Sequence, residues 1–445
     1  MSGRHILGSV VAASAVAVLI TAFGTPPAAA QDDADGPATD ATTTTATPSG
    51  GETLQGRLRS DGEPVAGVEI SAESDGATVG SATTGRDGAW AISLPGPGTY
   101  DLVLDTATLP EGVDLRDAER ARFEVNVRSG QIRNVLFPLG ERAAGSSESD
   151  VDQFIKLLAI GVKIGLLVAM ASIGLSLIYG VTNLVNFAHG ELVTLGALTA
   201  FFFNAAGGGP GIHVIPATIL AVIIGGLVGL AMERGMFAPL RRRHTEGVAL
   251  IVFTIGLSIL IRHLFLIAFG GQPRPYTDYT VQRAFDVGPV ALPAKDYVIS
   301  IVGVLVLVAV GVLLQKTRVG TGMRAVADNR DLAEASGIDV NAIIRFTWVL
   351  AGALAALGGA LLGLTESVSW DMGFRLLLFM FAAVVVGGLG TAYGAMVGGL
   401  LVGVVSQVST FWVPIEFKDA IALGVLILVL IARPQGILGL RERVG

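Results

Sequence analysis

The chain contains no cysteine among its 445 residues, so disulfide bonds and thiolate metal sites are excluded. No glycine is followed directly by lysine. The phosphate-binding loop that ends in Gly-Lys-Ser or Gly-Lys-Thr is therefore absent as well. A chain without this loop does not bind ATP in that way. If it takes part in an ATP-driven process, it must obtain the energy from a partner.

Charged side chains are also scarce. They make up 15% of the residues, against about 25% in typical soluble domains, and 51% of the residues are hydrophobic. Residues 31–150 hold 21 acidic and 9 basic side chains, whereas residues 151–445 hold 16 acidic and 20 basic ones. This asymmetry indicates an acidic, water-exposed module joined to an apolar membrane domain.

The N-terminus has the parts of a secretory signal. A short basic start precedes an apolar run over residues 6–23 and three alanines at 28–30. We expect a signal peptide over residues 1–30 that is cleaved after Ala30, with an uncleaved anchor as the alternative. Either outcome exports the segment that begins at Gln31. Residues 31–51 are poor in apolar side chains and predict a disordered linker.

Residues 52–140 predict a small extracytoplasmic β-sandwich of antiparallel strands. Short stretches alternate apolar and polar side chains and are bounded by Gly, Pro or Asp. The pattern resembles the carboxypeptidase-regulatory-like, or transthyretin-like, β-sandwich, and the module is either a spacer or a binding domain. The clearest strands are Gly67–Ala72, Ala89–Leu94, Thr99–Leu104 and Arg122–Val127, and Arg86–Gly88 predicts a turn.

After a linker at 141–153, residues 154–440 predict a polytopic helical bundle of about nine transmembrane helices. Lys and Arg are concentrated after the third, fifth and ninth apolar runs, which places those ends and the C-terminus in the cytoplasm. Between residues 376 and 412, the sequence is compatible with a tight turn and with a broken helix. The predicted spans lie near 154–180, 190–206, 214–238, 247–269, 297–315, 343–365, 376–390, 394–412 and 418–432.

Other unusual residues in the spans have structural explanations. Glycines recur at helical spacing, for example at Gly225, Gly229 and Gly399, and predict faces on which helices approach closely. Glu233 and Arg234 lie near a predicted span end, where snorkelling to the membrane interface accounts for them.

The connection between the first two spans is unusually polar. Asn183, Asn186, His189 and Glu191 lie within nine residues. Polar groups at membrane depth are costly and usually face a cavity or a partner, so these four are candidates for a translocation path. The alternative is an ordinary interfacial turn, in which Gly190 breaks the first helix and Glu191 caps the second.

A second polar segment, at 317–339, separates two strongly apolar spans and has helical composition. A long charged connection of this kind is seldom a simple turn. We predict that it docks a cytoplasmic partner. The expected coupling residues are Gly322, Arg324, Asp328, Arg330, Ala333, Glu334 and Gly337, with Ala333 and Gly337 permitting close approach.

Five separated segments carry further motifs: Ser176–Glu191, Glu233–Arg241, Gly320–Ile338, Gly387–Gly399 and Lys418–Gly439. In this order they resemble the motifs of branched-chain amino acid ABC transporter permeases. The resemblance implies the membrane subunit of an importer in the bacterial cytoplasmic membrane. An external substrate-binding protein, a second homologous permease and two ATP-binding subunits would be its partners. ATP would be used by those subunits, with no cofactor, metal or catalytic site in this chain and no nucleic acid bound.

Three other functions stay open. Related permeases carry urea, short amides or other amino acids. A secondary transporter or channel would need no ATPase. A membrane-anchored surface binding protein would act through residues 52–140, although about nine spans are excessive for an anchor.

Overall fold

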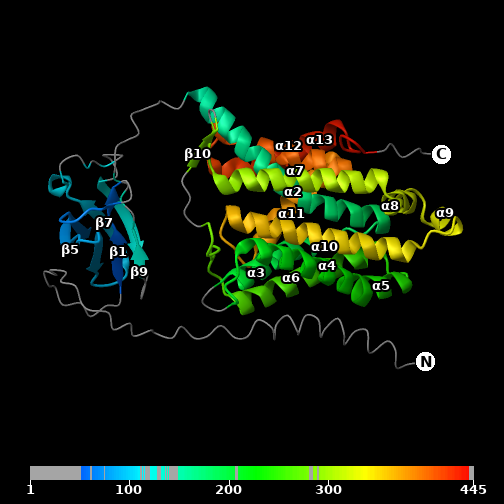
Figure 1. Ribbon diagram of the computed structural model, residues 1–445, viewed down its shortest axis with the longest axis horizontal. Helices are drawn as coiled ribbons and strands as arrows, with labels where there is room; N and C mark the ends of the chain where they lie inside the picture. Colours follow the sequence, from blue (N-terminus) through cyan, green and yellow to red (C-terminus); the bar gives the residue numbers. More distant parts are fainter. Residues whose placement is uncertain are drawn as a thin grey trace. The chain divides into compact units, whose positions relative to one another are not determined.

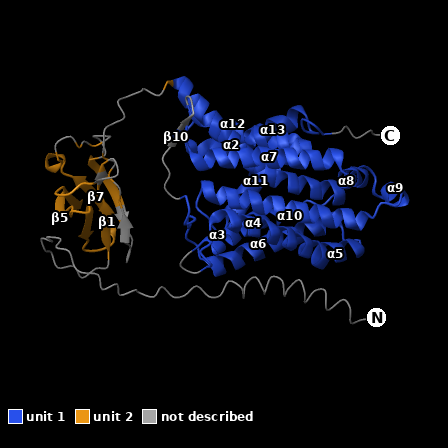
Figure 2. Cartoon of the chain, in the orientation of Figure 1, with its two compact units in different colours: residues 1–30, 150–445 blue, residues 31–149 orange. Residues whose placement is uncertain are grey.

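The computed structural model describes residues 52–439 with short gaps. The gaps are 61–62, 75, 111–112, 114, 116–120, 128–131, 136, 138, 140–148, 206–208, 280–283 and 288–289. The described residues form two compact units, one within Gln31–Ser149 and one within Asp150–Gly445 (Figure 2). The predicted signal peptide, the linker at 31–51 and most of the linker at 141–153 lie outside the described residues.

The first unit consists of two small sheets and a short hairpin, β2 with β3. One sheet has the order β5-β4-β7-β8 and is antiparallel throughout, and the other has the order β6-β1-β9. The strands are β1 (Thr53–Arg57), β2 (Arg59–Ser60), β3 (Glu63–Pro64), β4 (Glu69–Ser74), β5 (Ala77–Thr83), β6 (Ala89–Ser93), β7 (Gly98–Leu104), β8 (Arg122–Val127) and β9 (Ile132–Asn134).

The two sheets share one core, as a sandwich requires. Side chains that alternate along the strands, such as Leu54, Trp90 and Leu102, are buried together. The predicted strands are therefore confirmed, and Gly88 has the positive φ of 73° that its predicted turn needs. One expectation was wrong: β9 pairs with β1 in parallel, because the chain crosses to the other sheet after β8 instead of forming a hairpin.

The second unit is a bundle of helices that lie side by side along one direction (Figure 1). A π-helical turn, η3 (Glu233–Phe237), follows α4, and two 3-10 turns, η4 (Ser409–Phe411) and η5 (Ile415–Phe417), precede the last helix. A hairpin of β10 (Ala284–Val287) and β11 (Val290–Pro293) leads into α7. The helices are α2 (Asp150–Thr182), α3 (His189–Asn204), α4 (Val214–Met232), α5 (Ala238–Arg242), α6 (Gly247–Phe269), α7 (Ala294–Lys316), α8 (Arg318–Asp328), α9 (Arg330–Ala335), α10 (Val340–Thr365), α11 (Met372–Gly387), α12 (Ala392–Val408) and α13 (Lys418–Ala432).

A mostly helical membrane protein with an N-terminal β unit is thus confirmed, but the count of about nine spans is not. Within the described chain, six helices are long and apolar enough to cross a membrane. They are Asp150–Thr182, Val214–Arg242, Gly247–Phe269, Ala294–Lys316, Val340–Thr365 and Ala392–Phe411. The other apolar helices, α3, α11 and α13, have only 15 or 16 residues. At 1.5 Å per residue they span about 24 Å, which is less than the ~30 Å of hydrocarbon.

Two of the short helices, α3 and α11, are short because irregular chain lies next to them in the bundle. The segment 183–188 enters the bundle before α3 begins. The turn 388–391 joins α11 to α12, so the tight turn is correct and the broken helix is not. The amides of Ile437 and Leu438 donate to the carbonyls of Val386 and Gly387, at 2.8 and 2.9 Å, and so satisfy the end of α11.

Glycines set the closest contacts between helices. A Cβ on Gly399 of α12 would lie 2.5 Å from the Cα of Ala169 in α2, and a Cβ on Gly165 of α2 would lie 2.9 Å from the Cα of Leu400. On α4, a Cβ on Gly225 would lie 2.7 Å from the carbonyl oxygen of Gly352 in α10. The predicted glycine faces therefore form helix contacts, on which association in lipid depends.

We expect Gly399→Ala to lower the free energy of unfolding by about 1–3 kcal/mol, because the added methyl overpacks the contact between α2 and α12. Gly424→Ala on α13 is the matched control, since a Cβ there meets no atom within 4 Å. Thermal unfolding of the purified proteins in detergent measures the difference. Equal melting temperatures for the two variants would contradict the role of this contact.

Candidate translocation and coupling sites

The connection between α2 and α3 is a re-entry into the bundle. Asn183 ends α2 with a positive φ of 54°, and its amide donates to the carbonyl of Tyr179 at 2.7 Å. Asn183 is exposed, whereas Asn186 is buried. Because residues 183–188 are not helical, the two asparagines do not share a helix face. Gly190 lies inside α3 and not at a break, where it packs against Gly373, so the interfacial-turn alternative was wrong.

Asn186, His189 and Glu191 are buried in contacts within this chain. A ring nitrogen of His189, Nε2, is 3.1 Å from the carbonyl oxygen of Ala171 in α2. The hydroxyl of Ser258 in α6 donates to Glu191 Oε1 at 2.8 Å, so Glu191 does not cap α3. One polar atom of each side chain, Asn186 Nδ2, His189 Nδ1 and Glu191 Oε2, has no hydrogen-bond partner among the described atoms.

Of the four candidate path residues, the structure brings three into the interior and leaves Asn183 outside. His189 faces α2, whereas Glu191 faces α6, so the two do not point at one common space. A buried polar atom without a hydrogen-bond partner lowers stability, so its presence calls for a structural or functional explanation. Their role in a translocation path stays a prediction.

A buried ion pair joins α2 to α7, and the sequence analysis missed it. The amine of Lys163 lies 3.0 Å from the carboxylate of Asp296, and the two side chains are 6% and 9% exposed. Lys163 interrupts the apolar run predicted at 154–180, and this was the signal that could have found it. An ionisable residue inside an apolar span is expected to have a specific partner.

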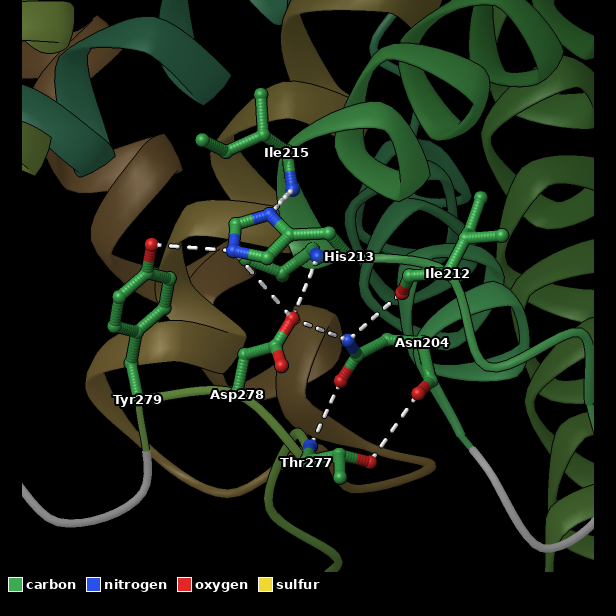
Figure 3. Close-up of polar contacts among 8 residues, drawn as sticks. Asn204, Ile212, His213, Ile215, Thr277, Asp278 and Tyr279 are labelled. Carbon is green, nitrogen blue, oxygen red and sulfur yellow. Dashed lines mark hydrogen bonds and ion pairs between the residues drawn. The ribbon is translucent and has the colours of Figure 1, made fainter.

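A polar network fastens the connection between α3 and α4 to the loop that follows α6 (Figure 3). Asp278 accepts hydrogen bonds at 2.8 Å from the Asn204 side chain and from the amide of Val214, at the start of α4. Asn204 in turn accepts from the amide of Thr277 at 2.7 Å. A carboxylate at a helix N-terminus is favoured by the helix dipole, and this one also ties the loop at 277–278 to α3.

The segment at 317–339, which was predicted to be helical, forms two helices that a cap separates. Asn329 ends α8, and its side chain accepts from the amide of Leu332 at 2.9 Å to begin α9. Gly337 then has a positive φ of 84°, which ends α9 and lets the chain turn into α10. Gly337 is thus needed for the turn.

Two predicted coupling residues face the bundle. Gly322 is buried beneath Ile343 of α10, and Ala333 is 3% exposed. The expectation that Ala333 permits approach of a partner was wrong, because its surface is already covered by this chain. Both residues therefore lie on the side of α8 and α9 that packs against the bundle.

The other predicted coupling residues form an exposed surface at one end of the bundle (Figure 1). Arg324, Asp328, Arg330 and Glu334 are exposed and carry both signs of charge. Leu332 lies among them and is 65% exposed, although it is large and apolar. Sequence analysis did not single out Leu332, because an apolar residue in a helical pattern is normally assigned to the core. An exposed apolar side chain with charges around it is typical of a protein contact.

Comparison with known proteins identifies the family of the helical unit. Residues 157–430 match the family described as "Branched-chain amino acid transport system / permease component". The chain belongs to this permease family. The match covers more than half of the chain and extends from within α2 to within α13, which confirms the predicted resemblance.

Named relatives resemble the permease over nearly their whole length. The high-affinity branched-chain amino acid transport system permease protein LivH of Salmonella typhimurium is 31% identical over 65% of this chain and 96% of its own. BraD of Pseudomonas aeruginosa, described in the same words, is 31% identical over 66% and 98%. The ribose import permease protein RbsC of Escherichia coli is 25% identical over 58% and 81%. No solved structure is significantly similar.

The permease has a cavity of about 250 Å³ at the end of the bundle opposite to α8 and α9. Its walls are apolar and come from α2, α10, α11, α12 and α13. Both signs of charge also line it, through Glu366, Arg375, Lys418 and Asp419. A molecule with an amine, a carboxylate and an apolar side chain would find partners for each part there. Within the part of the chain that the structure describes, no cluster of three or more His, Asp or Glu is placed to hold a metal ion.

We expect Lys163→Met to lower the free energy of unfolding by about 3–5 kcal/mol, because it leaves the carboxylate of Asp296 buried without its partner. The double variant Lys163→Met with Asp296→Leu should recover most of that loss, since no buried charge remains. Melting temperatures of the single and double variants test this. A double variant as unstable as the sum of the two single ones would show that the pair is not coupled.

Proposed function

We propose that this permease forms one half of the translocation path of an ATP-driven importer for branched-chain amino acids. The match of residues 157–430, most of the helical unit, to the family carries the proposal. The cavity opposite to α8 and α9 supports it, because a branched-chain amino acid is a zwitterion with an apolar side chain. In a purely apolar channel, the amine and the carboxylate of the amino acid would have no charged partner.

The permease would work with three kinds of partner. A substrate-binding protein delivers the amino acid outside, a second homologous permease completes the path, and two ATP-binding subunits contact the exposed surface of α8 and α9. The missing phosphate-binding loop supports this division of labour, since ATP is then bound and hydrolysed by the partners. The permease itself catalyses no reaction and needs no cofactor.

Transport would follow from alternating access. The permease has inward-open and outward-open states, and ATP shifts their populations through contacts that differ between the two. α8 and α9 connect α7 to α10, so a push on their exposed side chains reaches both long helices. α7 is tied to α2 by the ion pair between Lys163 and Asp296.

Sidedness follows from the basic residues. α5, which ends in Arg241 and Arg242 and is followed by Arg243, lies at the same end of the bundle as α8 and α9 (Figure 1). Lys and Arg concentrate on the cytoplasmic side of membrane proteins. The permease would lie in the cytoplasmic (inner) membrane with its C-terminus inside. The β unit would be outside, as the predicted export signal also requires.

Uptake of labelled leucine tests the substrate. In a strain that lacks the importer and its partners, restoring the complete set of genes should restore leucine uptake and leave urea uptake at background, because urea offers no charged groups. The strain restored with every partner except this permease is the control. Restored uptake of urea without leucine would reassign the permease to amides. Leucine uptake that needs no ATP-binding subunit would favour a secondary transporter or channel.

Combined reversal of charge at Arg324→Glu and Glu334→Arg should uncouple ATP hydrolysis from uptake. Uptake is expected to fall by about tenfold or more, within the usual range of a coupling free energy, while membrane insertion stays intact. Arg86→Glu, an exposed charge change in the β unit, is the control. Uptake and ATP hydrolysis are measured together in vesicles that contain the complete importer. Unchanged uptake in the double variant would overturn the docking surface.

A further inference from the structure

A second cavity, of about 230 Å³, lies where α4 continues into α5 and meets the start of α10. Three arginines line it, Arg234, Arg242 and Arg345, together with the side-chain amide of Asn341. α5, which carries part of the lining, lies at the same end of the bundle as α8 and α9 (Figure 1). None of the residues assigned above to transport or coupling lines it.

The described residues neutralise the positive charge of this cavity only in part. Glu233 also lines it, but Arg241 holds both oxygens of that buried carboxylate, one of them at 2.9 Å. The expectation that Glu233 snorkels to the interface was therefore wrong. Among the described residues Arg234 and Arg242 form no ion pair, and Arg345 lies 3.7 Å from the well-exposed carboxylate of Asp339. Three cations around one hollow repel each other unless an anion joins them.

The backbone at this place is irregular in a way that shapes the cavity. η3 is a π-helical turn between α4 and α5. Such a turn shifts the register of the side chains after it, and turns of this kind are frequent at functional sites. Within this turn Glu233 is buried, whereas the next residue, Arg234, is exposed and lines the cavity.

Apolar surface continues from the cavity along α4. Ile219, Ile223 and Leu227 recur every four residues along α4 and are 57%, 53% and 60% exposed, and Leu227 precedes Arg234 by seven residues. A ligand that satisfies the whole surface therefore has an anionic head for the arginines and a long apolar tail for α4. Free phosphate would satisfy the arginines alone.

We propose that this cavity, defined by Arg234, Arg242, Arg345 and Asn341, binds the phosphate head group of an anionic phospholipid whose acyl chain lies along α4. Basic hollows between membrane helices on the cytoplasmic side recognise such head groups. The lipid would fasten α4, α5 and α10 together. This inference does not depend on which solute the permease carries.

Binding of lipid to the purified full-length permease tests the proposal. Delipidated protein in neutral detergent is titrated with phosphatidylglycerol, with phosphatidylcholine and with inorganic phosphate, and the melting temperature and the bound lipid by native mass spectrometry are recorded. Phosphatidylglycerol should bind and stabilise, whereas phosphatidylcholine and phosphate should have little effect. Equal stabilisation by phosphate would replace the lipid by a free anion. Equal binding of the two lipids would overturn the charge-specific site.

Single variants locate the site. Arg234→Gln, Arg242→Gln and Arg345→Gln should each weaken the binding of phosphatidylglycerol by about fivefold, the factor expected for one cation near an anionic head group. Arg318→Gln, an exposed arginine at the same end of the bundle and outside the cavity, is the matched control and should bind like the unaltered protein. Undiminished binding in all three variants would overturn the proposal. If a variant does not fold, the lipid preference of the unaltered protein by mass spectrometry still decides.

Discussion

Close approach of helix backbones at glycines is the constraint on which the rest of this structure depends. Lipid tails are as apolar as leucine side chains, so burial of apolar surface does not drive membrane helices together as it does in water. α2 meets α12 at Gly165 and Gly399, and α4 meets α10 at Gly225 and Gly352, with no room for a Cβ at these contacts. These contacts put α2 and α10 at the centre of the bundle, and the exposed helices α6 and α13 at its edges.

A centre packed in this way has consequences for polar groups. Lys163 can be buried because Asp296 is positioned against it, and Glu191 because Ser258 is. Such groups are costly in hydrocarbon unless a partner is placed in advance, and the rigid helices provide that placement. The two ends of the bundle are left for function. One carries the mixed-charge cavity, and the other carries α8, α9 and the cluster of arginines beside α4.

Much of this could be predicted from particular residues. Apolar runs located the long helices, and alternation located β4, β6, β7 and β8. Basic residues such as Arg241 and Lys316 indicated an orientation. Other features had no local signal, because they depend on a partner far away in the chain. Nothing near Ala333 shows that α9 turns it toward the bundle, and nothing near Leu332 shows that α9 turns it outward. The shortness of α3 and α11 likewise arises from segments that enter the bundle beside them.

By itself, the sequence determined the class of the protein: a membrane permease that lacks its own phosphate-binding loop, joined to a small β unit. Length, hydropathy and ordered motifs suffice for this, because they are properties of each segment alone. Only the tertiary structure decided which polar side chains meet. It paired Lys163 with Asp296, separated His189 from Glu191 and gathered Arg234, Arg242 and Arg345 around one cavity. Such groupings depend on how helices distant in sequence pack, and spacing along the chain does not encode that packing.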